Sequence, residues 1–113
     1  IWGSVMHAEI RIGDSHIMMG DANPDMGMAS PDTLGGSAGG VMLYVPNVDK
    51  VWAAAVAAGA TVLMPLDNQF WGDRYGQMKD PFGHKWSLAT HIEDMSPKEM
   101  QRRGDAFMAQ FTQ

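Results

Sequence analysis

The segment at residues 46–60 constrains the fold more than any other part of the chain. It reads PNVDKVWAAAVAAGA, and its apolar residues recur at helical spacing along one stripe: Val48, Val51, Trp52, Ala55 and Val56. Asn47 or Asp49 can cap the start of this helix, and Gly59 ends it. The short apolar run VMLYV at residues 41–45 precedes it and predicts a buried strand. The sequence therefore predicts a strand followed directly by a helix.

Three more strands are predicted after the helix. The first is TVLMP, which we expect to stop at Pro65. The other two are RYGQMKD and HKWSLAT, on either side of a DPFG turn. In the last strand, alternation sets Trp86 and Leu88 on one face with His84, and Ser87 on the other face. From residue 41 the order is strand, helix, strand, strand, strand, which predicts an α+β fold.

The first forty residues predict a hairpin and a linker. Residues 5–12, VMHAEIRI, alternate between apolar and polar, a GDS turn follows, and HIMMGD reads as a second, antiparallel strand. Residues 22–40 are rich in Gly, Pro, Ser and Asp, which predicts a long loop. We therefore assign residues 1–21 to a hairpin and residues 22–40 to a linker.

The last segment, residues 95–113, predicts a tail helix. Ser96, Pro97 and Glu99 form a capping box with proline at the first helical position. The apolar residues that follow are only loosely helical in spacing. We expect this helix to dock on its own domain or on a partner chain.

Composition excludes several classes of function. The formal net charge of −5 argues against nucleic acid or an anionic membrane as the main partner, because both need clustered Lys and Arg. The absence of cysteine excludes disulfides, thiolate nucleophiles and cysteine-based zinc sites. No apolar run reaches membrane-spanning length, and the start of the chain turns polar too soon for a signal peptide. We expect a soluble, cytoplasmic protein.

The strand order, together with DPFGHKW between the last two strands, resembles the vicinal-oxygen-chelate superfamily of glyoxalases, bleomycin-resistance proteins and dioxygenases. HAEIRIGDSHIMMGD, QFWGDRYG and EDMSPKEMQRR resemble its PhnB-like branch more closely. The resemblance covers nearly the whole chain as a single domain, residues 1–113. It implies paired β-α-β-β-β units that form a curved mixed sheet around a pocket.

In this chain only residues 41–91 correspond to a complete unit. The hairpin corresponds to the end of a first unit that is truncated at its N-terminus. An open sheet edge tends to pair with another chain, so we expect a homodimer. One arrangement of such a dimer is an exchange of structural elements between the two chains.

The same resemblance implies where metal-dependent members hold their metal. Three of the four ligand positions fall at Met18, Gly40 and Ser87, and none of these residues is a usual ligand of a divalent metal. We therefore expect no metal and no cofactor. The alternative is an unrecognised metal site at His7 and His16, if these face each other across the hairpin.

The remaining candidates gather in the aromatic segment at residues 67–86. Arg74 offers a fork for a carboxylate or phosphonate, and the aromatic rings offer faces for stacking. The alternative is that the rings plug one end of the sheet. The predicted ligand-binding set, drawn from this segment, the first hairpin and the last strand, is Met18, Phe70, Trp71, Arg74, Tyr75, Trp86 and His91.

Three functions remain open at this point. The first is a metal-independent protein that binds a small organic molecule in an aromatic, Met-lined pocket. The second is a metal-dependent lyase or dioxygenase-like enzyme. The third is a non-catalytic fragment completed by a partner chain.

Overall fold

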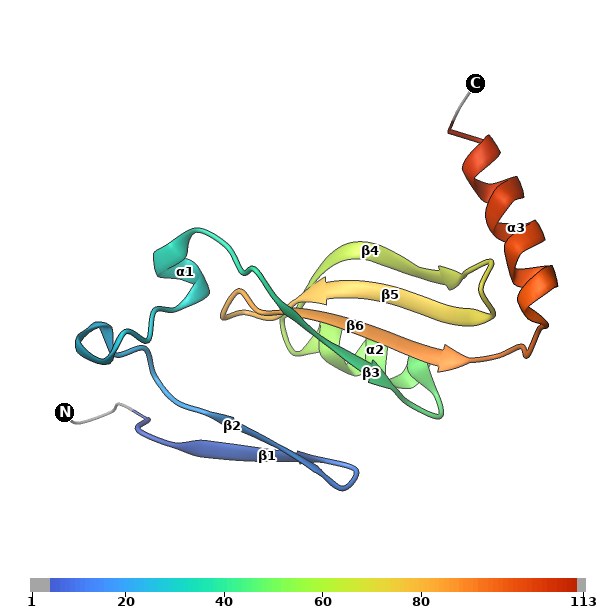
Figure 1. The fold of residues 1–113 in the computed structure, drawn as a ribbon. Coiled ribbons are helices and arrows are strands. Elements are labelled where there is room, and N and C mark those ends of the chain that lie inside the picture. Colours follow the sequence, from blue (N-terminus) through green and yellow to red (C-terminus); the bar gives the residue numbers. More distant parts are fainter. Residues whose placement is uncertain (1–4, 112–113) are drawn as a thin grey trace. The chain divides into compact units, whose positions relative to one another are not determined.

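The computed structural model describes residues 5–111, and the chain divides into two compact units between Gly36 and Ser37. Figure 1 shows the elements of each unit. The division falls inside the predicted linker. Among the described residues, no helix is long and apolar enough to cross a membrane.

The first unit contains the predicted hairpin. Strands β1 (Ala8–Ile12) and β2 (Ser15–Met19) pair antiparallel, with Ile10 opposite Ile17. The linker is not a plain loop as predicted, because it contains a 3-10 turn, η1 (Pro24–Met26), and a short helix, α1 (Pro31–Leu34). Helix α1 forms because the Ser30 side chain accepts a hydrogen bond from Thr33 N at 3.2 Å and proline stands at the first position.

The second unit has the predicted strand and helix order. Its elements are β3 (Gly40–Tyr44), α2 (Val48–Ala57), β4 (Thr61–Asn68), β5 (Asp73–Lys79), β6 (Lys85–His91) and α3 (Pro97–Ala109). The sheet order is β3-β6-β5-β4, with β3 parallel to β6 and the other pairs antiparallel. The predicted α+β class is confirmed. The DPFG turn is also present, with Gly83 N donating to Asp80 O at 3.0 Å.

Strand β4 corrects the prediction that Pro65 ends a strand, because it runs on to Asn68. Proline has no N–H to donate, and it is tolerated in a strand at a sheet edge or beside a bulge. Both conditions hold, since β4 stands last in the sheet order and its register with β5 shifts between Met64 and Asp67.

Helix α2 covers one face of this sheet (Figure 1), and the core lies between them. Val48, Met78 and Leu88 are buried, with Trp52 and Trp86 among the residues packed against them. Strand alternation places the side chains of Tyr44, Tyr75 and Ser87 on the opposite face. We call this opposite face the open face, because much of Met42 and Tyr44 stays exposed there.

The tail helix α3 docks on its own unit. Ser96 Oγ accepts from Glu99 N at 3.1 Å, so the predicted cap is present. The ring of Phe107 lies 5.1 Å from that of Phe70, and Arg103 pairs with Glu93 at 2.6 Å. The helix is thereby held against the end of the open face.

Candidate functional site

A buried carboxylate organises one end of the open face. Asp73 is only 2% exposed. Its Oδ2 accepts hydrogen bonds from Tyr44 Oη at 2.7 Å and from Trp71 Nε1 at 3.0 Å, and its Oδ1 lies 2.9 Å from His91 Nδ1. Three side chains from β3, the β4–β5 turn and β6 thus converge on one carboxylate. We call Tyr44, Trp71, Asp73 and His91 the Asp73 cluster.

Local geometry explains how Trp71 and Tyr44 reach Asp73. Gly72 has a φ of 93°, which favours glycine, and its carbonyl accepts from Ile92 N and Glu93 N. This close turn places Trp71 beside the first residue of β5. Ala89 pairs with both Tyr44 and Tyr75, and its small side chain leaves room for Tyr44 to reach across β6.

The cluster carries linked charges. Burial acts to raise the pKa of Asp73, but the hydrogen bonds from His91, Tyr44 and Trp71 outweigh it and hold this pKa below the ordinary value. The hydrogen bonds to Asp73 and then to Asp94 raise the pKa of His91. The bond to Asp73 likewise raises the pKa of Tyr44. A charged carboxylate and a protonated imidazole therefore support each other.

Aromatic rings continue from the cluster along the open face. The rings of Trp71 and Tyr75 meet edge to face at 5.5 Å, and those of Phe70 and Trp71 do so at 5.0 Å. Tyr75 Oη donates to Ser87 Oγ at 3.1 Å and accepts from Gln77 Nε2 at 2.7 Å. Those two bonds do not use the amide oxygen of Gln77 or the hydroxyl hydrogen of Ser87, so both can meet a ligand.

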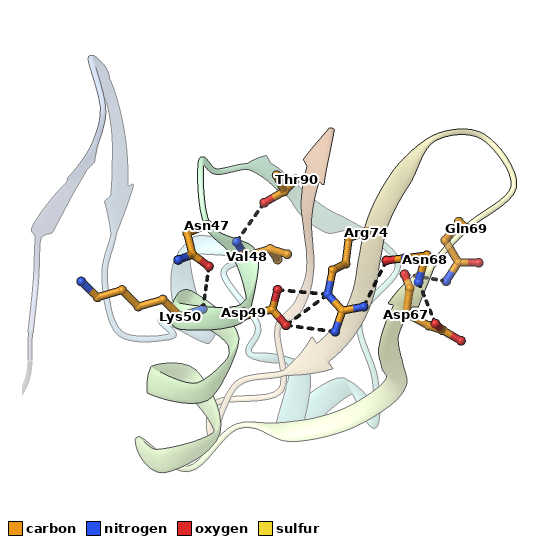
Figure 2. Close-up of polar contacts among 9 residues, drawn as sticks. All are labelled: Asn47, Val48, Asp49, Lys50, Asp67, Asn68, Gln69, Arg74 and Thr90. Carbon is orange, nitrogen blue, oxygen red and sulfur yellow. Dashed lines mark hydrogen bonds and ion pairs between the residues drawn. The ribbon is translucent and has the colours of Figure 1, made fainter. Parts of the chain in front are cut away.

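Two predicted ligand residues lie elsewhere. Arg74 is on the face that α2 covers, where its Nε and Nη2 bind the carboxylate of Asp49 at 2.9–3.1 Å and its Nη1 binds Asn68 at 3.1 Å (Figure 2). Trp86 packs against the core and donates from Nε1 to Asp80 Oδ2 at 2.9 Å. The structure therefore brings together Phe70, Trp71, Tyr75 and His91, but not Arg74 or Trp86.

The third predicted ligand residue outside the site is Met18, which lies on β2 in the first unit and is 67% exposed. In the same unit, His7 and His16 do not face each other directly. Each lies 4.0 Å from the carboxylate of Glu9, and all three side chains are solvent-exposed. Over residues 5–111, no three His, Asp or Glu side chains are arranged to hold a metal ion.

The metal positions implied by the family do not fit a metal either. Gly40 has no side chain, and Ser87 Oγ is already the acceptor of the Tyr75 hydroxyl. A thioether, a hydrogen and a neutral hydroxyl form a poor donor set for a divalent ion.

Sequence reasoning missed the centre of the site. Asp73 is not among the predicted ligand-binding residues, although alternation in DRYGQ sets Asp73, Tyr75 and Gln77 on one face. Tyr44 was part of a strand predicted to be buried, yet its side chain is on the open face and 61% exposed. For both residues, the alternation of side chains between the two faces of a strand was the signal that places them on the open face.

Comparison with known proteins identifies the class of this fold. The structure resembles that of PA1353 from Pseudomonas aeruginosa with a TM-score of 0.62 and 26% identity, over 80% of this chain and 65% of that chain. It also resembles the PhnB protein from Bacillus cereus with a TM-score of 0.57, over 78% of this chain and 66% of that chain. At 22% identity, the second likeness concerns the fold alone.

The model of the Glyoxalase/Bleomycin resistance protein/Dioxygenase superfamily matches residues 2–88. The chain therefore belongs to that superfamily, as predicted. The uncharacterized protein Mb0911c from Mycobacterium bovis is 40% identical over 102 residues, which are 88% of this chain and 67% of that protein. This chain thus spans about two thirds of the length of the relatives it matches.

Proposed function

We propose that this chain binds a small organic molecule on the open face, beside the Asp73 cluster, without a metal. One observation carries the proposal. A carboxylate that is 2% exposed holds Tyr44, Trp71 and His91 in place, while Tyr44 and His91 remain more than half exposed. A buried polar centre that fixes exposed rings is a preorganised surface, and such surfaces lose little entropy when a ligand binds.

The half-buried groups of the open face favour an uncharged ligand with a planar ring. The rings of Trp71 and Tyr75 provide apolar area, and Gln77 and Ser87 provide an acceptor and a donor beside them. Both ring nitrogens of His91 are engaged by carboxylates, so His91 has no N–H left for an anion. Arg74 stays outside the proposed site, because Asp49 and Asn68 occupy its guanidinium.

A thermal-shift screen of small organic molecules tests the proposal, because a ligand of the folded state raises the melting temperature. Tyr75→Leu removes one ring and its hydroxyl. We expect its affinity for a hit to fall roughly tenfold, since an aromatic contact contributes about 0.5–1.5 kcal/mol beyond its area. Arg74→Gln is the matched control from the neighbouring position on the other face, and its affinity should match wild type. If Tyr75→Leu bound the hit as tightly as wild type while Arg74→Gln lost affinity, the ligand would lie on the face that α2 covers, and the proposal would be wrong.

We also propose that the chain associates with a second copy of itself. Strand β3 pairs only with β6 in the described sheet, which leaves one of its edges open. An open edge carries backbone groups that can pair with another strand. Light scattering coupled to size-exclusion chromatography measures the mass directly, and a monomer across the micromolar range would contradict this proposal.

A further inference from the structure

A second feature lies on the other side of the sheet. A cavity of about 280 Å³ opens between α2 and the sheet, on the face opposite the Asp73 cluster. Its walls are almost wholly apolar. They include Leu43, Ala55, Ala58, Met78, Trp86 and Leu88.

The sequence of α2 explains why no side chain fills this space. Near the start of the helix, the Trp52 ring fills the gap so closely that a Cβ on Gly76 would lie 2.6 Å from it. Toward the end of the helix, the residues that line the cavity are alanines, Ala55 and Ala58. Side chains of one carbon cannot span the distance from helix to sheet. The helix and sheet are thus packed tightly at one end and separated at the other.

The one charged group in the cavity wall is already satisfied. Asp80 Oδ1 accepts from Phe82 N at 2.9 Å and from His84 N at 3.0 Å, and Oδ2 accepts from Trp86 Nε1 at 2.9 Å. Burial has the largest single effect on the pKa of Asp80 and acts to raise it. The three hydrogen bonds together have a greater, opposite effect and hold this pKa below its ordinary value. A ligand in this cavity therefore meets a fixed negative charge and apolar walls, with no donor offered to it.

We propose that this cavity binds a small, uncharged apolar molecule containing one or two rings. An enclosed apolar cavity of about 150 Å³ can take up benzene. This cavity is larger and open to solvent on one side, so a ligand can enter it directly. The Asp80 carboxylate disfavours anions, and its satisfied oxygens give no preference for a hydrogen-bonding ligand. This site is independent of the proposed function on the open face, because the sheet separates the two.

Fluorobenzene is a suitable probe. Binding is followed by its fluorine NMR signal and by the indole N–H signals of 15N-labelled tryptophan in the protein. We expect the Trp86 signal to move and that of Trp71, on the open face, to stay. Phenylacetate, a ring of similar size with a negative charge, should bind at least tenfold more weakly. No movement of Trp86 up to the solubility limit of fluorobenzene, or equal binding of phenylacetate, would overturn the proposal.

A matched pair of variants places the probe. Ala58, the C-cap of α2, lines the cavity, whereas Ala54 of the same helix does not, and both residues are exposed. Ala58→Leu fills the space and should weaken fluorobenzene binding at least tenfold, whereas Ala54→Leu should leave it unchanged. Unchanged binding in Ala58→Leu contradicts the site. Movement of the Trp86 signal on dilution, without the probe, would instead show that a second copy of the chain covers the cavity.

Discussion

The hydroxyl of Tyr44 donates a hydrogen bond of 2.7 Å to the carboxylate of Asp73, 29 residues further along the chain. The bond crosses β6, the strand that separates β3 from β5 in the sheet. It is possible because the residue beneath it, Ala89, is small and fully buried. This link joins the first strand of the unit to its fourth element and sets the position of the exposed rings.

Asp73→Asn tests how much the cluster depends on the carboxylate. An amide offers one acceptor oxygen where the carboxylate offers two, so at least one of the donors from Tyr44, Trp71 and His91 loses its partner. We expect the free energy of unfolding to fall by about 1–3 kcal/mol, measured by urea denaturation. Asp94→Asn is the control, because Asp94 is almost fully exposed and should change stability by no more than about 0.5 kcal/mol. Equal effects of the two changes would contradict the central role of Asp73.

The pH dependence of stability tests the charge of His91. Asp73 and Asp94 raise the pKa of His91 in the folded protein above its value of about 6.5 in an unfolded chain. Protonation of His91 therefore stabilises the fold fully below about pH 6.5, and this contribution is lost as the pH rises through the folded-state pKa. The difference in unfolding free energy between wild type and His91→Gln should shrink over that range. A constant difference, or an NMR titration of His91 with a midpoint below 6.5, would count against this charge assignment.

Gly76→Ala tests the packing of α2. A Cβ at this position would lie 2.6 Å from two ring atoms of Trp52 and 3.0 Å from Leu66 Cα, so the helix must shift. Overpacking of this kind costs about 1–3 kcal/mol, which a urea titration measures. The control is Gly39→Ala, since nothing lies within 4 Å of a Cβ there. If both variants unfolded at the same urea concentration, the close packing of Trp52 on β5 would be wrong.

Metal addition tests the proposed independence from metal. The purified chain is dialysed against Zn²⁺, Ni²⁺ or Mn²⁺ and then against buffer, and the bound metal is measured by mass spectrometry. We expect much less than one ion per chain, because Gly40 and Ser87 supply no suitable donors. One ion per chain would contradict the proposal. Loss of that ion in His16→Ala would then place it in the hairpin beside Glu9.

The sequence predicted the fold well because its signals are local. Helix α2 has the predicted Asn47 cap and closing glycine, and Val48, Trp52 and Ala55 of its predicted apolar stripe pack in the core. Val51 and Val56 of that stripe are exposed instead. The DPFG turn likewise needs only neighbouring residues, since Asp80 accepts from Phe82 and His84 within it. The prediction that Pro65 ends a strand was wrong because a strand at the sheet edge tolerates proline. The local sequence does not show which strand forms the edge.

The site was harder to predict because its contacts are distant in sequence. Phe70, Trp71, Tyr75 and His91 do gather, but the residue that joins three elements at the cluster, Asp73, needs partners 2, 18 and 29 residues away. Arg74 and Tyr75 were both placed in the predicted ligand-binding set because they are adjacent in the chain. Adjacent residues of a strand, however, point to opposite faces of the sheet. Strict use of alternation would have separated them and added Asp73 and Gln77.

The most direct test of the account follows individual tryptophans while a hit from the thermal-shift screen is titrated into 15N-tryptophan-labelled protein. Trp71 lies on the open face, and Trp52 belongs to α2 and packs against the opposite face of the sheet, so their indole N–H signals report on the two faces separately. Substitution of each tryptophan by phenylalanine assigns the signals. We predict that the Trp71 signal moves in proportion to bound ligand while the Trp52 signal stays fixed. Movement of Trp52 with an unchanged Trp71 would contradict a ligand site beside the Asp73 cluster.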